Sequence, residues 1–306
     1  MIEVHRFLTE EQAKNCVVEG DAAFDSELNS ISDKLLVTHG RFHSSEVKAI
    51  VLCGPSCAGK TTTAKKITKM LEEKGKRVHV LSIDDFYYER DLLIKRSGSD
   101  KIDFDSPATI DTEELGLTVR EIFDDNENVV EVPVYDFLTG KRAEPRFIPV
   151  DDRDIFIFEG IQAFYPNVIG MFNAYPTTTI YISPMKSIKA GSLVFEPATL
   201  RFMRRIVRDY YRRNAAPEFT FEIWNSVRAN EDANIFPYYG CAKIHLNSTV
   251  CYEVGMLKPY LDEILPLVPR KSVYYYQAQD LLEAISDFTP IDKKYLSQDS
   301  LFHEFV

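Results

Sequence analysis

The stretch VLCGPSCAGKTTTAKKI at residues 51–67 changes from an apolar run to a loop and then to a helical pattern. Its glycines and lysine have the spacing Gly54-x-x-x-x-Gly59-Lys60-Thr61. This spacing is typical of a loop whose backbone N–H groups point at a polyphosphate, while the following helix adds the positive end of its dipole. Lys60 would then reach the terminal phosphates, and the Thr61 hydroxyl would bind Mg²⁺.

A glycine turn without chemistry is the alternative, because four fixed positions recur by chance in about one chain of this length in a hundred. The context favours the phosphate loop. A strand-like apolar run over 47–53 precedes it, and apolar residues with helical spacing follow it as far as Leu71. The residues predicted to contact the nucleotide are Gly54, Pro55, Ser56, Cys57, Ala58, Gly59, Lys60, Thr61 and Thr62.

Composition and charge restrict the class of protein. The chain of 306 residues is 45% hydrophobic and 27% charged, as expected for a globular enzyme. Its net charge of −11 argues against a general nucleic-acid-binding role, which needs a basic surface. No apolar run approaches the roughly 18 residues that cross a bilayer, and the polar start does not resemble a secretory signal. We therefore expect a cytoplasmic protein with no membrane partner.

One stretch departs from this acidic balance. Between residues 201 and 213 lie six arginines and a single acid, Asp209, and the spacing puts most of the arginines on one helical face. A solvated basic face is the ordinary explanation. In a chain with a phosphate loop, however, arginine side chains match the oxygens of a transferring phosphoryl group, so we favour a catalytic role.

Strand-like runs alternate with helical patterns along the chain. This alternation predicts an α/β fold with a parallel sheet covered by helices on both faces, and ligands gathering at the carboxyl ends of the strands. The strand-like runs are 47–53, 77–83, 154–159, 177–183 and 241–247, and the helical patterns begin at 60 and near 112–124.

Acidic residues end two of these predicted strands. Asp84 and Asp85 follow the run that ends at Ile83, and Glu159 ends the third run. Acids at strand ends also cap turns. Beside a bound nucleotide, one carboxylate can take the proton of an attacking hydroxyl while another helps to bind magnesium. Neighbouring residues of an extended run point to opposite sides, so we expect only Asp84 to face the acceptor.

Four further stretches, together with the loop, resemble the uridine kinase branch of the phosphoribulokinase and uridine kinase family. They are SIDDFYYERD (82–91), VPVYDFLTGKR (132–142), FEGIQAF (158–164) and RRIVRDYYRR (204–213). The resemblance covers roughly residues 46–250 and implies a P-loop NTPase-type sheet. The reaction that it implies is ATP- and Mg²⁺-dependent phosphorylation of a small-molecule hydroxyl, with the 5′-hydroxyl of uridine or cytidine expected first.

The segments outside this core are expected to be helical extensions. They cover residues 1–45 and 251–306, and the endings LKPYLDEILPLVP and DSLFHEFV look like those of the bacterial subgroup. Neither extension carries a motif with a chemical role. They could pack on the core or join subunits, and a homo-oligomer is left open.

The resemblance also implies roles for individual residues. Asp84 matches the family's catalytic aspartate, and Asp105 in DFDSP matches its ligand for the ribose hydroxyls. A carboxylate can accept two hydrogen bonds from a cis-diol, although an acid before Pro107 can also simply form a turn. The remaining implied site residues are Tyr87 and Tyr135 for the nucleoside, Arg205, Arg208 and Arg213 in a lid near 196–215, and Thr61 with Glu159 for the metal.

Two departures from the family pattern leave the acceptor open. Gly140 stands where many uridine kinases have histidine, and Ala215 stands where the lid often has another arginine. Gly140 also fits a plain hairpin turn in LTGK. The alternatives are a kinase for a sugar phosphate, a pantothenate-like alcohol or another nucleoside, and an ATP-sensing regulator.

Overall fold

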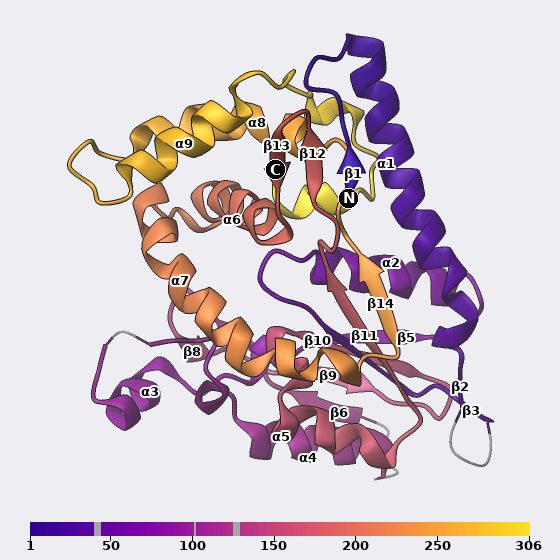
Figure 1. The fold of residues 1–306 in the computed structure, drawn as a ribbon. Coiled ribbons are helices and arrows are strands. Elements are labelled where there is room, and N and C mark those ends of the chain that lie inside the picture. Colours follow the sequence, from indigo (N-terminus) through magenta and orange to yellow (C-terminus); the bar gives the residue numbers. More distant parts are fainter. Residues whose placement is uncertain (40–43, 101, 125–128) are drawn as a thin grey trace.

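A parallel sheet forms the centre of the computed structural model, which describes residues 1–39, 44–100, 102–124 and 129–306 (Figure 1). Its strand order is β14-β11-β4-β10-β5, and each neighbouring pair is parallel. The strands are β4 (Ala49–Cys53), β5 (Val78–Ser82), β10 (Ile155–Gly160), β11 (Thr177–Ser183) and β14 (Ile244–Asn247). All five predicted strands are therefore confirmed.

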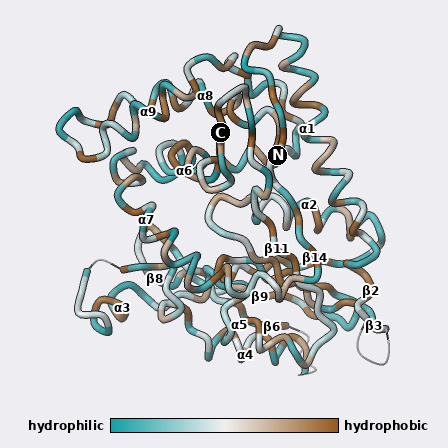
Figure 2. The backbone as a smooth tube through the Cα atoms, viewed as in Figure 1, coloured by the Kyte–Doolittle hydropathy of each residue, from teal (hydrophilic) through white to brown (hydrophobic). Residues whose placement is uncertain are grey.

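Two hydrophobic cores cover the two faces of this sheet, because successive strand residues point to opposite sides. In β4, Ile50 and Leu52 join one core, whereas Val51 and Cys53 join the other. The first core packs against α2 (Lys60–Glu72), and the second packs against α4 (Thr112–Phe123) and α5 (Pro166–Ile169). Figure 2 shows brown, apolar backbone in the region of the central strands. The expectation of helices on both faces is confirmed.

The strand order brings the candidate site residues to one edge of the sheet. β4 lies between β11 and β10, and Cys53 at the end of β4 is in register with Gly160 at the end of β10. The phosphate loop follows β4, and Asp84 follows β5, which pairs with the other side of β10. All three carboxyl ends therefore open onto the same edge, as the sequence predicts.

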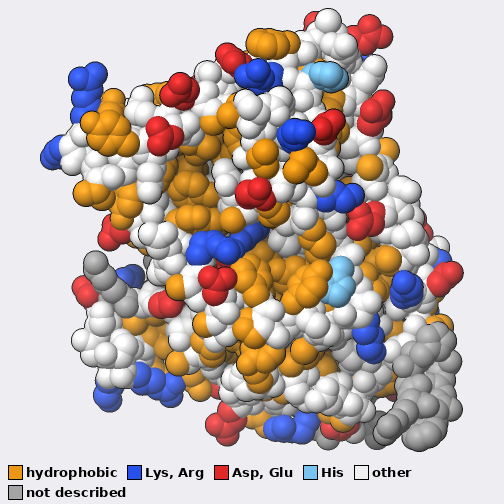
Figure 3. Space-filling model, in the orientation of Figure 1, with side chains coloured by type: hydrophobic (Ala, Val, Ile, Leu, Met, Phe, Trp, Pro, Cys, Tyr) orange, Lys and Arg blue, Asp and Glu red, His pale blue; other side chains and the backbone are white. Residues whose placement is uncertain are grey.

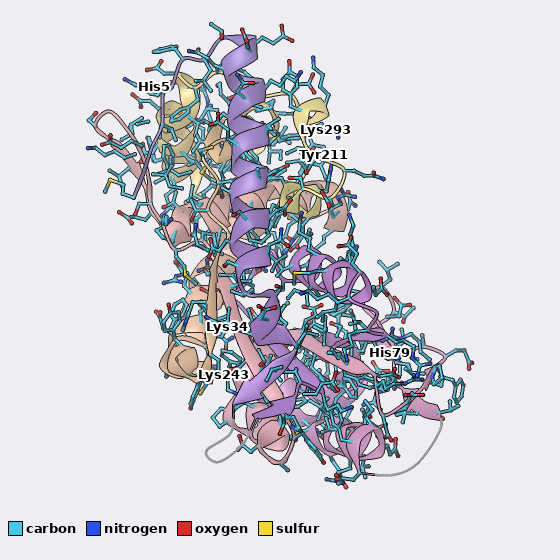
Figure 4. All side chains as sticks on the ribbon, turned by 90° about the vertical axis from the view of Figure 1, so that its right-hand side faces the viewer. His5, Lys34, His79, Tyr211, Lys243 and Lys293 are labelled. Atoms are coloured by element: carbon cyan, nitrogen blue, oxygen red, sulfur yellow. The ribbon has the colours of Figure 1, made fainter. Side chains whose placement is uncertain are left out.

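The N-terminal extension packs directly on the core. Its helix α1 (Glu10–Ser30) buries Val17, Phe24 and Leu28 in the same cluster as α2. Figure 4 shows α1 running along one side of the molecule, with Lys34 just beyond its end and Lys243 nearby. The extension also contains the strand β1 (Ile2–Glu3), which pairs with β12 (Ile188–Ala190), and β12 pairs with β13 (Leu193–Phe195).

The chain continues after β13 through a helical layer above the carboxyl edge of the sheet (Figure 1). This layer consists of α6 (Pro197–Arg213), α8 (Glu253–Ile264) and α9 (Tyr275–Ser286), whereas α7 (Pro217–Asn234) runs from α6 down to the level of the sheet and precedes β14 (Figure 1). The final segment forms a 3-10 turn, Leu301–Glu304, against α2. In the described part of the chain, no helix is long and apolar enough to cross a membrane.

The remaining elements are α3 (Arg90–Ser97) and three antiparallel pairs. The pairs are β2 (Val37–His39) with β3 (Ser44–Glu46), β6 (Val129–Val132) with β9 (Arg146–Pro149), and β7 (Tyr135–Asp136) with β8 (Lys141–Arg142). Gly140, in the turn between β7 and β8, has φ 68°, so the predicted glycine turn is confirmed.

Candidate active site

The loop between β4 and α2 has the form of a phosphate-binding loop. A Cβ on Gly54 would lie 2.2 Å from the carbonyl oxygen of Ile182, so only glycine fits at the start of the loop. Cys57 and Gly59 have positive φ values of 59° and 95°, a backbone form that can turn neighbouring N–H groups toward one side. Because α2 begins directly afterwards at Lys60, its first N–H groups add to this positive end.

Lys60 lies over the loop that precedes it. Its Nζ donates hydrogen bonds to the carbonyl oxygens of Gly54 and Pro55, at 3.0 and 3.3 Å. A phosphate oxygen would hold this ammonium more strongly than a neutral carbonyl does, so Lys60 is free to turn toward a polyphosphate. The next side chain, Thr61, is exposed at the same helix start.

Glu159 provides a buried carboxylate beside the loop. It lies in β10 between Leu52 of β4 and Ser82 of β5. Burial raises the pKa of Glu159 to about 7, the positive charge of Lys60 opposes this shift, and the negative charge of Asp84 adds to it. Since such interactions weaken with distance, Glu159, Lys60 and Asp84 share one electrostatic neighbourhood.

Asp84 and Asp85 face different partners, but the predicted reason is wrong. They lie in a 3-10 turn, Ile83–Phe86, and not in an extended run, because β5 ends at residue 82. Asp84 Oδ1 accepts a hydrogen bond from Gln162 Nε2 at 3.0 Å, whereas Asp85 Oδ1 accepts one from the backbone N–H of Tyr135 at 3.2 Å. Separate partners therefore turn the two carboxylates apart.

Aromatic side chains gather next to Asp84. Tyr87 packs edge-on against Phe104, Tyr135 and Phe137, with ring centroids 5.2, 5.5 and 5.9 Å away. Tyr87 and Tyr135 are buried, but Phe137 is 59% exposed. Among the described residues, no partner hydrogen-bonds the buried hydroxyl of Tyr135. This aromatic cluster offers flat apolar surface of the kind that packs against a ring-shaped ligand.

Asp105 lies close to the same aromatic cluster. Tyr165 donates a hydrogen bond to its backbone carbonyl at 2.6 Å and so fixes this part of the loop. Burial raises the pKa of the Asp105 carboxyl to about 6, Arg205 opposes the shift, and Asp103 and Asp84 add to it. Asp105 is therefore close enough to Arg205 and to Asp84 for their charges to affect it.

Five of the six arginines of α6 divide into two groups. Arg201 and Arg204 are buried and form ion pairs with Glu231 and Glu253. Each also donates a hydrogen bond to a backbone carbonyl of the phosphate loop, at 3.2 and 3.3 Å. These two arginines therefore stabilise the phosphate loop, and their charges are neutralised by the two glutamates. This structural role differs from the catalytic role expected for the whole arginine stripe.

The second group of arginines borders the site. Arg205 Nη1 donates to the hydroxyl of Ser56 in the loop at 2.8 Å, and its Nε donates to Asp209. Arg208 and Arg213 also contact Asp209, at 2.6 and 3.6 Å. Three guanidinium groups thus share one carboxylate, which leaves a local surplus of positive charge. Figure 3 shows Lys or Arg side chains grouped in the middle of the molecular face, surrounded by hydrophobic ones.

The sequence interpretation missed several residues that shape this site. Gln162 is fully buried and joins Asp84 to the hydroxyl of Tyr87, although it stands inside the FEGIQAF stretch. A lone amide in an otherwise apolar run was the available signal. The partners of the buried arginines, Glu231 and Glu253, lie in later helices and carry no local signal.

A phosphate loop, a carboxylate at the next strand end and arginines around both define a P-loop phosphotransferase. Residues 49–254 match the model of the phosphoribulokinase/uridine kinase family. Because this match covers more than half of the chain, the protein belongs to that family. It is a kinase that transfers a phosphoryl group to a hydroxyl.

Similar proteins agree with this assignment. A uridine kinase from the bacterium Ureaplasma urealyticum is 27% identical over 177 residues, which are 58% of this chain and 76% of that protein. Uridine-cytidine kinase B from Dictyostelium discoideum is 28% identical over 186 residues, which are 60% of this chain and 68% of that protein. A solved structure described as a fructose transport system kinase, from Silicibacter sp. TM1040, is 15% identical to this chain and has a TM-score of 0.50. The match covers 78% of this chain and 99% of that one, and it supports the fold.

Proposed function

We propose that this kinase transfers the γ-phosphoryl group of ATP to the 5′-hydroxyl of uridine or cytidine. The observation that carries the proposal is the position of Asp84. Asp84 follows β5 directly, next to the strand that carries Glu159, and Gln162 joins its carboxylate to the hydroxyl of Tyr87 in the aromatic cluster. A hydroxyl held beside that cluster would therefore meet a carboxylate beside the phosphate loop.

On the donor side, the loop N–H groups and Lys60 bind the phosphates. Arg205 contacts the loop already, and Arg208 and Arg213 supply further positive charge next to it. Charge spreads over the transferring oxygens in phosphoryl transfer, so arginines placed here stabilise the transition state. Residues Gly54 to Thr62 thus hold the donor, and the arginines stabilise the negative charge on the phosphoryl oxygens during the transfer.

Magnesium fits the oxygen atoms present at this edge. Mg²⁺ commonly takes one or two protein oxygens and completes its shell with phosphate oxygens and water. The exposed hydroxyl of Thr61 and the carboxylate of Glu159 would hold it there. When bound, the ion neutralises phosphate charge during transfer. It would also lower the pKa of Glu159, which burial raises to about 7.

On the acceptor side, three groups have distinct tasks. Asp84 takes the proton of the attacking hydroxyl, and Gln162 holds its carboxylate in place from the buried side. Asp105 accepts hydrogen bonds from the ribose diol, which orients the sugar. Tyr87 and Tyr135, with their aromatic neighbours, form the surface for the base.

One observation favours a different acceptor within the same reaction class. A Cβ at Gly140 would lie 2.8 Å from Cβ of Arg90, and the φ of 68° disfavours other residues. No side chain can therefore approach the acceptor from this position. A sugar phosphate, a pantothenate-like alcohol or another nucleoside remains the second candidate. An ATP-sensing regulator without an acceptor is less well supported, since Asp84 and Glu159 are both in place.

An acceptor panel distinguishes these candidates. ADP release with Mg²⁺ and ATP would be measured with uridine, cytidine, purine nucleosides, pantothenate and sugar phosphates. We expect kcat/KM for uridine or cytidine to exceed every other acceptor by at least about tenfold, since a polar site rejects analogues that leave its groups unpaired. Greater turnover of a sugar phosphate would establish the second candidate, and ATP binding without any turnover would establish a regulator.

A further inference from the structure

The end of the chain reaches the phosphate loop itself. Glu304 Oε2 accepts hydrogen bonds from the backbone N–H and the hydroxyl of Thr62, at 3.4 and 3.3 Å. Leu301 packs on the loop so closely that a Cβ on Gly59 would lie 2.5 Å from its Cδ1. In Figure 1 this yellow segment lies next to α2.

Helix α6 anchors the same segment. Arg212 donates hydrogen bonds to the carbonyl oxygens of His303 and Val306, at 3.3 and 3.2 Å. The guanidinium of Arg204 lies over the rings of Phe302 and Phe305, 5.2 and 4.9 Å from their centroids. Both rings are buried. The position of Glu304 is therefore set by a packed turn and not by a loose end.

The position of this carboxylate has a chemical meaning. Free N–H groups at the start of a helix that follows a phosphate loop are binding groups for phosphate oxygens. At Thr62, an N–H and a hydroxyl of this kind already hold an anion that belongs to the chain. Two lysines further along α2 are paired elsewhere, Lys66 with Asp25 and Lys69 with Asp299. The carboxylate of Glu304 thus has the loop end as its partner.

The contact is also weak enough to be exchanged. The distances from Glu304 to the N–H and the hydroxyl of Thr62 both exceed the range of roughly 2.7 to 3.2 Å that is usual for a good hydrogen bond. A cavity of about 340 Å³ lies directly beside it, between Lys65 on α2 and His303 in the final turn. Glu304 can therefore withdraw into open space while Phe302 and Phe305 stay buried.

We propose that Glu304 occupies the place of a donor phosphate at Thr62 and must leave it before the donor binds. Glu304 then acts as an autoinhibitory competitor that lowers the affinity for polyphosphates. This inference rests on the proposed function only for the class of donor, a nucleoside triphosphate. It concerns the donor side of the site and is independent of the acceptor.

Binding measurements on the full chain test this competition. Calorimetric titration with inorganic tripolyphosphate and with ADP would compare wild type, Glu304→Gln and Glu304→Asp. Glutamine keeps the shape but removes the charge, so we expect Kd for both probes to fall about 10- to 30-fold, the low end of the range for hydrogen bonds to charged groups because this contact is long. Aspartate keeps the charge but shortens the reach, and should give a smaller decrease. Glu263→Gln on α8 removes the same charge away from the loop and should leave Kd unchanged.

The outcomes separate this inference from the proposed function. An unchanged Kd in Glu304→Gln would overturn the competition. A weaker Kd would also overturn it and would make Glu304 a contact of the donor. Tighter binding of the probes by Glu304→Gln, without phosphorylation of any acceptor on the panel, would contradict the proposed function but support the competition. Failure of both probes to bind to wild type and Glu304→Gln alike would overturn both.

Discussion

Asp105 is a site residue whose proposed role depends directly on pH. Burial raises its pKa to about 6, and only the ionised carboxylate can accept two hydrogen bonds from a diol. We expect KM for the acceptor to rise roughly tenfold as the pH falls from 7 to 5, since one pKa unit corresponds to a factor of ten. KM for ATP should change much less. Steady-state ADP release at each pH measures both.

Asp105→Asn is the control for this pH dependence. The variant should have a raised KM for the acceptor at pH 7 and a flat profile below it. The substitution should not lower Tm at pH 7. The pKa of the Asp105 carboxyl is higher in the folded state than in the unfolded state, so this group stabilises the fold at low pH. That contribution is lost as the pH rises through about 6. If the wild-type KM for the acceptor stays constant from pH 7 to 5, Asp105 does not bind the diol.

At the scale of single residues, the motifs predicted where the candidate site residues stand in the sheet. They did not predict which neighbouring residues hold those side chains in place. Asp84, Glu159 and Lys60 could be predicted because each stands at a strand end or in a loop of fixed spacing. The turn that separates Asp84 from Asp85 could not, since β5 ends one residue earlier than the apolar run suggests. Gln162 was missed because its partner lies 78 residues away.

At the scale of elements, α6 combines an anchored part with a cationic part. Buried ion pairs hold Arg201 and Arg204, whereas Arg205, Arg208 and Arg213 share Asp209. We propose that the later part of the segment 196–215 is a lid that closes over the phosphates, because a polyphosphate would neutralise its surplus charge. The anchored part should stay in place.

Hydrogen exchange measures this division. On addition of a bisubstrate inhibitor, exchange should slow in residues 208–215 and stay unchanged in 197–207. Without ligand, the anchored part should already be protected, since its ion pairs and its apolar face, which ends with Ile206 and Val207, are buried. Equal protection of 208–215 with and without the inhibitor would instead identify α6 as a static structural helix.

The elements themselves were well predicted where the pattern is local. The five strands of the sheet are short apolar runs, and α2 and α4 carry their apolar residues at helical spacing. The split of the arginine stripe was not predictable, because Glu231 and Glu253 lie 30 and 49 residues beyond their partners. Their meeting depends on how α7 and α8 pack on α6.

At the scale of the whole molecule, both extensions belong to the same packed body as the kinase core. α1 and the final turn share one hydrophobic cluster with α2. Composition gave no sign of this arrangement, since the extensions carry no motif and contact residues far away in the chain. Glu304 illustrates the consequence, because its partner Thr62 is 242 residues away. The C-terminal extension therefore reaches the active-site edge and not only the outer surface.

The central claim is that Asp84 accepts the proton of a hydroxyl beside the phosphate loop. Asp84→Asn keeps the shape and the hydrogen bond to the acceptor but cannot take up the proton. The direct measurement is kcat for uridine phosphorylation by this variant, with the product identified by mass and ATP affinity measured in parallel. We predict that kcat falls by roughly two to four orders of magnitude while Kd for ATP stays within about threefold. A variant that phosphorylates uridine at a rate near wild type would contradict the account.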